Sequence, residues 1–131
     1  MKKIKVLMVD DEVDFLKVMR ERMESWGYDI TTALSGNEAL NIIKEGLIDI
    51  VILDYMMPQM DGISVLKDIR KRDTALPVIM FTAYPDNKSI EGAEDLGVIA
   101  FIPKLSTYTD VQLTLKSALS IAQNKIKDKK G

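Results

Sequence analysis

The sequence predicts an α/β fold in which a single parallel sheet is covered by helices on both faces. Five short apolar runs alternate with five longer amphipathic segments, which is the pattern of repeated βαβ units. The runs Asp49–Leu53 and Val78–Phe81 are nearly continuous in large apolar residues, as expected for central strands with no solvent-facing side. At 131 residues the chain has the usual length of one domain, and no repeat or Gly/Ser-rich linker divides it.

The remaining strands complete the predicted sheet around these two central runs. Apolar residues gather at the N-terminus, after Gly27 and after Gly97, each time between turn or helix signals. We therefore expect strands at Ile4–Val9, Tyr28–Ala33 and Val98–Ile102.

The intervening segments predict helices whose ends are marked by glycines and capping residues. Gly27 and Gly46 are expected to stop the first two helices, and the fourth is expected to end before Gly97. The expected N-terminal caps are Ser35–Glu38, Asp61, Asp86 or Asn87, and Thr107–Asp110. Residues expected to face the core include Phe15, Met19, Met23, Trp26, Val65, Leu66, Ile69, Val111, Leu115, Ala118, Leu119, Ala122 and Ile126.

The composition excludes several kinds of chemistry. The chain has no histidine and no cysteine, which excludes an imidazole base, a histidine phosphoryl carrier and a thiolate nucleophile. The formal net charge of -2 gives no general attraction to nucleic acid or to anionic membranes. No apolar run approaches the roughly 20 residues of a membrane span. We therefore expect a soluble, cytoplasmic protein that binds neither nucleic acid nor a membrane directly.

Reactive polar residues follow four of the predicted strands. Asp10–Glu12 follow the first strand, Asp54 the third, Thr82 the fourth and Lys104 the fifth. In open parallel sheets, ligands bind beyond the carboxyl ends of the strands. An acidic pair after one strand would by itself be explained equally well as a helix cap, but four such strand ends together favour a functional site.

The acidic residues at these strand ends predict a metal and phosphoryl chemistry. The carboxylates of Asp10, Asp11 and Asp54 would repel one another unless a cation compensates them. Hard oxygen ligands favour Mg²⁺ or Mn²⁺, which also accepts a phosphate oxygen. Phosphoryl transfer needs a nucleophile, a metal and a further donor or cation. Asp54, the metal, Thr82 and Lys104 match these requirements, so the residues predict phosphoryl transfer to Asp54.

Four sequence motifs resemble those of response regulator receiver domains, which act in two-component signal transduction. They are VDDE ending at Glu12, LDYMMPQMDG ending at Gly62, FTA ending at Ala83 and FIPK ending at Lys104. They span essentially the whole chain in the family's order. The resemblance implies a doubly wound, flavodoxin-like (βα)5 fold with strand order 2-1-3-4-5. We expect one receiver domain over residues 1–124 and a basic tail over 125–131.

The resemblance also implies roles for individual residues. Asp54 is implied as the phosphoacceptor and, with Asp11, as a direct ligand of Mg²⁺, whereas Asp10 would act through water. The backbone carbonyl of Met56 is implied as a further ligand. The implied partners of the phosphoryl oxygens are the ammonium of Lys104, the hydroxyl of Thr82 and the amide of Ala83.

Two positions near the fifth strand bear on the switch and on the site lysine. Phe101 matches the family's aromatic switch position, whose ring turns inward when the hydroxyl of Thr82 is drawn toward the phosphoryl group. A simple core-packing role for Phe101 is the alternative. Family members usually carry Pro directly after the active-site Lys, whereas here Pro103 precedes Lys104 and Leu105 follows it.

The leading hypothesis is a phosphorylated signalling switch that is not an enzyme for an external substrate. A histidine kinase or histidine phosphotransfer protein would donate to Asp54, and a protein target would bind the face of the fourth helix, fifth strand and fifth helix. An aspartate-dependent phosphohydrolase would need a second Asp where Met56 stands. A nucleotide-binding protein on the same sheet would need a first loop less acidic than this one. A receiver that belongs to a longer protein with an effector domain also stays open.

Overall fold

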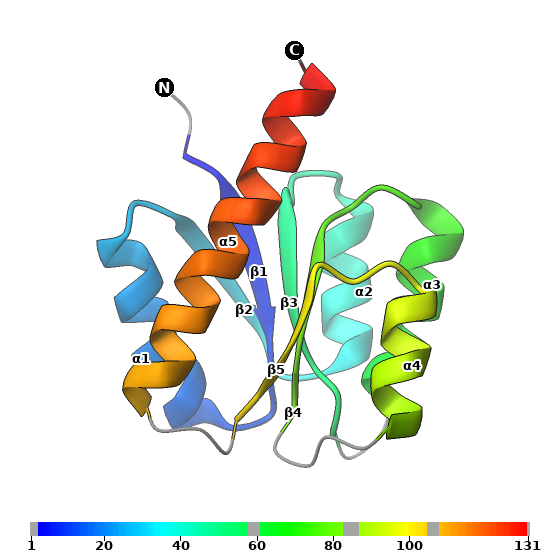
Figure 1. Ribbon diagram of the computed structural model, residues 1–131, viewed down its shortest axis with the longest axis horizontal. Helices are drawn as coiled ribbons and strands as arrows, with labels where there is room; N and C mark the ends of the chain where they lie inside the picture. Colours follow the sequence, from blue (N-terminus) through cyan, green and yellow to red (C-terminus); the bar gives the residue numbers. More distant parts are fainter. Residues whose placement is uncertain (1–2, 58–60, 83–86, 105–107, 131) are drawn as a thin grey trace.

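The computed structural model describes residues 3–57, 61–82, 87–104 and 108–130 (Figure 1). In this part of the chain, five strands form one parallel sheet in the order β2-β1-β3-β4-β5, with five helices packed around it. The α/β fold and the strand order are therefore as predicted. The strands are β1 (Lys5–Val9), β2 (Asp29–Ala33), β3 (Ile50–Asp54), β4 (Val78–Thr82) and β5 (Ala100–Pro103), and the helices are α1 (Val13–Ser25), α2 (Gly36–Lys44), α3 (Gly62–Arg72), α4 (Asn87–Asp95) and α5 (Tyr108–Lys130).

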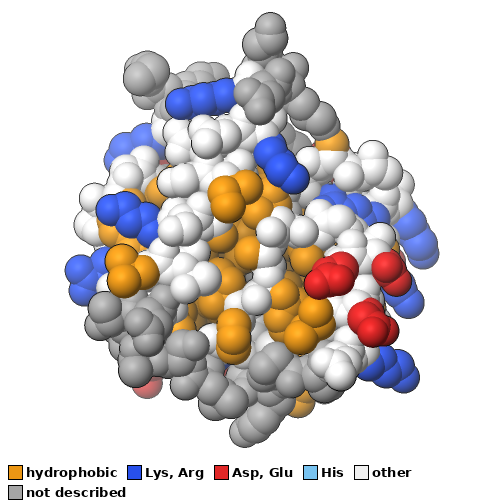
Figure 2. All heavy atoms as spheres, in the orientation of Figure 1, with side chains coloured by type: hydrophobic (Ala, Val, Ile, Leu, Met, Phe, Trp, Pro, Cys, Tyr) orange, Lys and Arg blue, Asp and Glu red, His pale blue; other side chains and the backbone are white. Residues whose placement is uncertain are grey.

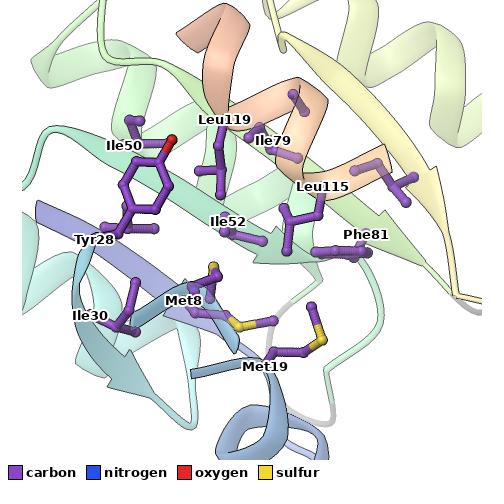
Figure 3. Packing of buried hydrophobic residues seen from close by; sticks show 14 of the residues in the cluster. Met8, Met19, Tyr28, Ile30, Ile50, Ile52, Ile79, Phe81, Leu115 and Leu119 are labelled. Atoms are coloured by element: carbon purple, nitrogen blue, oxygen red, sulfur yellow. The ribbon is translucent and has the colours of Figure 1, made fainter. Parts of the chain in front are cut away.

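The sheet is a middle layer between two groups of helices. α1 and α5 cover one face, and α2, α3 and α4 cover the other (Figure 1). Successive residues of β1 alternate between the two faces, since Val6 and Met8 belong to the core cluster under α1 and α5, whereas Leu7 and Val9 belong to the opposite one. Figure 3 shows the first of these clusters. Both faces of the central strands are buried, which explains their nearly continuous apolar sequence.

Several predicted helix ends are confirmed by their backbone geometry. Ser35 Oγ accepts a hydrogen bond from the amide of Glu38 at 3.2 Å, and Asp61 Oδ1 accepts one from the amide of Ser64 at 2.8 Å. Gly27, with φ +98°, has the left-handed backbone conformation that ends a helix at little cost. The predicted caps at Asp86 and Thr107 lie outside the described residues.

The last helix extends further than the sequence suggested. α5 runs to Lys130, so residues 125–130 are helical, and the expected boundary at residue 124 falls inside this helix. Figure 1 shows the end of α5 projecting past the strands. None of the described helices is both long and apolar enough to cross a membrane.

Candidate functional site

The carboxyl ends of β1, β3, β4 and β5 lie together at one end of the sheet, the lower end in Figure 1. Asp10 comes directly after β1, Asp54 ends β3 and Thr82 ends β4. All three are buried, with exposed fractions of 1%, 3% and 0%. The predicted convergence of these residues at the strand ends is therefore present. Because polar side chains are seldom fully buried, their position favours a functional site.

Lys104 is drawn into this end of the sheet rather than into solvent. Its side chain is 8% exposed, and its Nζ lies 2.6 Å from Asp10 Oδ2 and 3.5 Å from Asp54 Oδ2. The exposed carboxylate of Glu12 lies 3.0 Å from the same nitrogen. The backbone amide of Lys104 donates to the carbonyl of Thr82 at 2.6 Å, which anchors the lysine beside the end of β4. The change in proline position therefore leaves the lysine inside the site.

Three carboxylates form a cluster suited to a divalent cation. Asp10, Asp11 and Asp54 each offer an oxygen, and these oxygens lie within 4.8 Å of one another. Asp11 is exposed, while Asp10 Oδ2 is buried and is paired with the ammonium of Lys104. An all-oxygen donor set with one accessible carboxylate fits Mg²⁺, which keeps several of its waters.

Burial and crowding shift the protonation of these groups. Burial, with the nearby charge of Asp10, raises the pKa of Asp54 to about 7, against the opposing effects of Lys104 and the Met56 amide. Burial also raises the pKa of Asp10, although Lys104 favours the ionised form. Burial acts to lower the pKa of Lys104, but the hydrogen bond and charge of Asp10, with Asp54 and Glu12, outweigh it and raise the pKa. Full ionisation of all three carboxylates would therefore leave more negative charge than one ammonium compensates.

A close backbone approach shapes the segment that carries Asp54. The amide of Gly62 donates to the carbonyl of Tyr55 at 2.7 Å. A Cβ atom at Gly62 would lie 2.6 Å from the carbonyl oxygen of Asp54 and 2.7 Å from Tyr55 Cα. Only glycine leaves room for this contact. The sequence motif ends in this glycine, but its spacing alone did not reveal that the first turn of α3 packs on the backbone of Asp54 and Tyr55.

Phe101 and Met56 lie close to the strand ends that carry the acidic cluster. Phe101 is partly buried and packs on the core cluster beneath α2, α3 and α4. It pairs with Met80 in the sheet, so strand alternation puts Phe101 and Thr82 on the same face. The amide of Met56 donates to Asp54 Oδ1 at 3.3 Å, while the Met56 side chain is half exposed. Ala83 lies outside the described residues.

Two neighbours of Lys104 were not recognised from the sequence as parts of the site. Glu12 was noted at the strand end but received no role, and Phe15 was assigned only to the core face of its helix. The structure places the Lys104 nitrogen 4.6 Å from the centroid of the Phe15 ring. Helical periodicity identified the buried side of α1 correctly, but it does not show which residue of that side meets a cation from a distant strand.

Comparison with known proteins agrees with this geometry. Residues 6–116 match the response regulator receiver domain family. The chain is 33% identical over 117 residues to the transcriptional regulatory protein ZraR of Escherichia coli K12, covering 89% of this chain and 26% of that relative. The chain therefore spans about a quarter of this relative's length. It belongs to the response regulator receiver domain family, and it is a receiver of the two-component type.

Solved structures share the fold. A CheY-like receiver domain protein from Methanospirillum hungatei JF-1 superposes with a TM-score of 0.84 at 23% identity, covering 95% of this chain and 99% of that one. The response regulator TrrA of Thermotoga maritima, solved in complex with Mg(2+)-BeF, gives a TM-score of 0.75 at 30% identity over 88% of this chain and 98% of that one. The flavodoxin-like arrangement is thus common to all three.

Proposed function

We propose that this receiver accepts a phosphoryl group on Asp54 and that Asp10, Asp11 and Asp54 hold Mg²⁺, or Mn²⁺, beside it. The convergence of a buried Asp54 with two further carboxylates and a buried lysine is the observation that carries the proposal. Following the family pattern, Asp11, Asp54 and the Met56 carbonyl would contact the ion directly, and Asp10 through water. The bound ion would supply positive charge to the developing phosphoryl group.

The residues of the chain supply the other requirements of the transfer. A carboxylate oxygen of Asp54 forms the new bond to phosphorus, and the bond between phosphorus and the donor atom breaks with its electron pair leaving on the donor. The ammonium of Lys104, which lies 3.5 Å from Asp54 Oδ2, is close enough to neutralise charge on a phosphoryl oxygen. The Thr82 hydroxyl and the Ala83 amide are proposed to bind the other oxygens.

We further propose how the signal enters and leaves the domain. The chain has no histidine of its own to carry a phosphoryl group, and the receiver family implies that the donor is a histidine kinase or a histidine phosphotransfer protein. Thr82 and Phe101 share one face of the sheet at its β4 and β5 edge, which favours a switch in the surface of α4, β5 and α5. Figure 2 shows apolar side chains gathered across this side of the molecule with acidic ones next to them. A protein target is the partner that such a surface suits.

The same proposal covers the setting of the domain. We infer a cytoplasmic protein whose receiver is residues 1–124 with the basic segment 125–131 attached, and which makes no direct contact with nucleic acid or membrane. The net charge of -2 supports this. The chemistry is self-phosphorylation and autodephosphorylation, with no external substrate. Met56 stands where an aspartate-dependent phosphohydrolase would need its second acid, which disfavours that alternative.

The test is phosphorylation by a small donor. The protein is incubated with acetyl phosphate and Mg²⁺ and separated on a phosphate-affinity gel, and we expect a shifted band for wild type that is absent for Asp54→Asn. Asp61→Asn is the matched control, because this exposed acid caps α3 and asparagine caps equally well. A shifted band in Asp54→Asn, or none in wild type, would reject Asp54 as the acceptor. Hydrolysis of added phosphomonoesters by wild type that is lost in Asp54→Asn would point instead to an aspartate-dependent hydrolase.

A further inference from the structure

Phe15 connects the buried lysine of the site to the hydrophobic core. It lies in the first turn of α1, and its ring centroid is 4.6 Å from Lys104 Nζ. The same ring meets Phe81 edge to face, with centroids 6.0 Å apart and an interplanar angle of 85°. Phe81 is fully buried, directly precedes Thr82, and lies beside Leu115 in the packed cluster (Figure 3). Phe15 is therefore fixed by the core on one side and contacts the ammonium on the other.

The other contacts of the ammonium are of a different kind. Asp10 and Asp54, at 2.6 and 3.5 Å, belong to the carboxylate cluster that suits a divalent cation, so a bound ion would draw on the same groups. Glu12 has a side chain that is 61% exposed, and an ion pair so open to water contributes little. A benzene ring is not a ligand for a hard cation. Among the contacts of the ammonium with described residues, the one with Phe15 is therefore neither shared with the metal cluster nor made through a solvent-exposed carboxylate.

The environment strengthens the attraction between ring and lysine. An ammonium over an aromatic face is attracted by the ring's quadrupole, and the attraction grows as water is removed. The Lys104 side chain is only 8% exposed, so little water screens it. Leucine would fill much of the same space against Phe81 but would offer the ammonium no comparable partner.

We propose that Phe15 is a positioning residue that holds the ammonium of Lys104 over the acceptor carboxylate through its aromatic face. The inference rests on the proposed function, in which Lys104 neutralises charge on the phosphoryl group. It gives Phe15 a role beyond filling the core, and it predicts that the aromatic ring rather than side-chain volume determines how fast Asp54 is phosphorylated.

The experiment compares Phe15→Leu, Phe15→Tyr and wild type in the full chain. The rate of phosphorylation by acetyl phosphate with Mg²⁺ is followed by loss of unmodified protein. We expect Phe15→Leu to be slower by about threefold to tenfold, as a desolvated cation–π contact implies, and Phe15→Tyr to stay within about twofold of wild type. Equal rates for Phe15→Leu and wild type, or equal losses in Phe15→Leu and Phe15→Tyr, would overturn the proposal.

A second measurement reports the contact itself, independently of phosphorylation. The ε-methylene protons of Lys104 should show an upfield ring-current shift in the NMR spectrum of wild type and Phe15→Tyr that is lost in Phe15→Leu. If the shift is the same in all three proteins, Phe15 does not hold the lysine. If wild type shows the shift but accepts no phosphoryl group, the proposed function fails while the contact stands, so the two failures are distinguishable.

Discussion

Lys104 and Arg70 are cationic side chains at opposite ends of the sheet, and they bind different kinds of partner. At the carboxyl ends of the strands, Lys104 sits among carboxylates. At the other end, Arg70 of α3 donates from Nε to the carbonyl of Leu96 and from Nη1 to that of Leu76, both at 2.6 Å. Its Nη2 donates to the carbonyl of Gly97 at 3.2 Å. Arg70 thereby ties the end of α3 to the start of β4 and to the turn after α4.

The two cations differ in the charge of their partners, which suits Arg70 to stabilising the fold and Lys104 to a functional site. Burial lowers the pKa of Arg70, with the charge of Asp73 opposing, and the groups it binds are neutral carbonyls. At the acidic end the pKa of Lys104 is raised, and so are the pKa values of its partners Asp10 and Asp54. At the Arg70 end, backbone carbonyls are satisfied by hydrogen bonds from the guanidinium. The acidic end instead gathers three carboxylates around one ammonium, an excess of negative charge that a divalent cation could compensate.

The largest expected change in stability follows from removing the Arg70 side chain. Arg70→Ala removes several hydrogen bonds to partly buried carbonyls and should lower the free energy of unfolding by about 2 to 4 kcal/mol, without changing the rate of phosphorylation. Urea unfolding and the acetyl phosphate assay measure the two quantities. Arg72→Ala, an exposed neighbour on the same helix, is the control and should change neither. A slower phosphorylation in Arg70→Ala would show that the two ends are coupled.

The next effect concerns the close backbone contact between Gly62 and the segment that carries Asp54. Gly62→Ala places a methyl group against the backbone of Asp54 and Tyr55 and should cost about 1 to 3 kcal/mol of unfolding free energy while slowing phosphorylation. Gly92→Ala is the matched control, because the nearest atom to its new Cβ is a flexible methyl of Ile63 at 3.6 Å and alanine favours the helix. Loss of stability without slower phosphorylation would separate the packing of Gly62 from the geometry of the acceptor.

A smaller effect on stability follows from the burial of the Asp54 carboxylate near Asp10. The pKa of Asp54 rises from 3.8 to about 7 on folding, so folding binds a proton between these values and the ionised carboxylate destabilises the fold as pH increases. Without divalent cations, Asp54→Asn should therefore be more stable than wild type by about 1 to 2 kcal/mol at pH 8, with the gap narrowing as pH falls to 4. Thermal unfolding across this range is the measurement. A gap independent of pH would contradict the shifted pKa.

The smallest expected change in stability comes from an ion pair on the surface of α1, away from both Lys104 and Arg70. Arg20 and Glu24 form an i,i+4 ion pair of 3.1 Å on α1, with both side chains about half exposed. Because water screens the pair, Glu24→Gln should lower the unfolding free energy by at most about 0.5 kcal/mol and leave phosphorylation unchanged. Chemical unfolding sets this baseline. A larger loss would contradict the screening of this pair by water.

Much of the fold and of the site's location could be predicted because both follow from local pattern. Apolar runs fix the strands, and parallel strands necessarily bring Asp10, Asp54 and Thr82 to one edge. The strand order needed the family resemblance, since alternation of elements does not set it. The end of α5 was read as a tail because its lysines suggested a solvated segment. Lysine is also a good helix former, and the helix continues to Lys130.

The parts that sequence reasoning missed are contacts between distant segments. Phe15 and Lys104 are far apart in the chain, and their meeting depends on how α1 leaves β1. The carbonyls that hold Arg70 come from two separate turns. No periodicity encodes such pairings. The individual roles of Asp10, Asp11, Asp54, Thr82, Ala83, Phe101 and Lys104 in phosphorylation stay predictions for the experiments above.

Pro103 also affects how separate molecules of this protein can associate. β5 is the outermost strand next to β4, and an outer strand is where a second polypeptide adds by backbone pairing. The amide of Lys104 points inward to Thr82, so the nitrogen of the adjacent Pro103 is on the outer side, where it has no hydrogen to donate. With β5 only four residues long, this proline leaves few outward-facing amides on which a second polypeptide could pair with that strand.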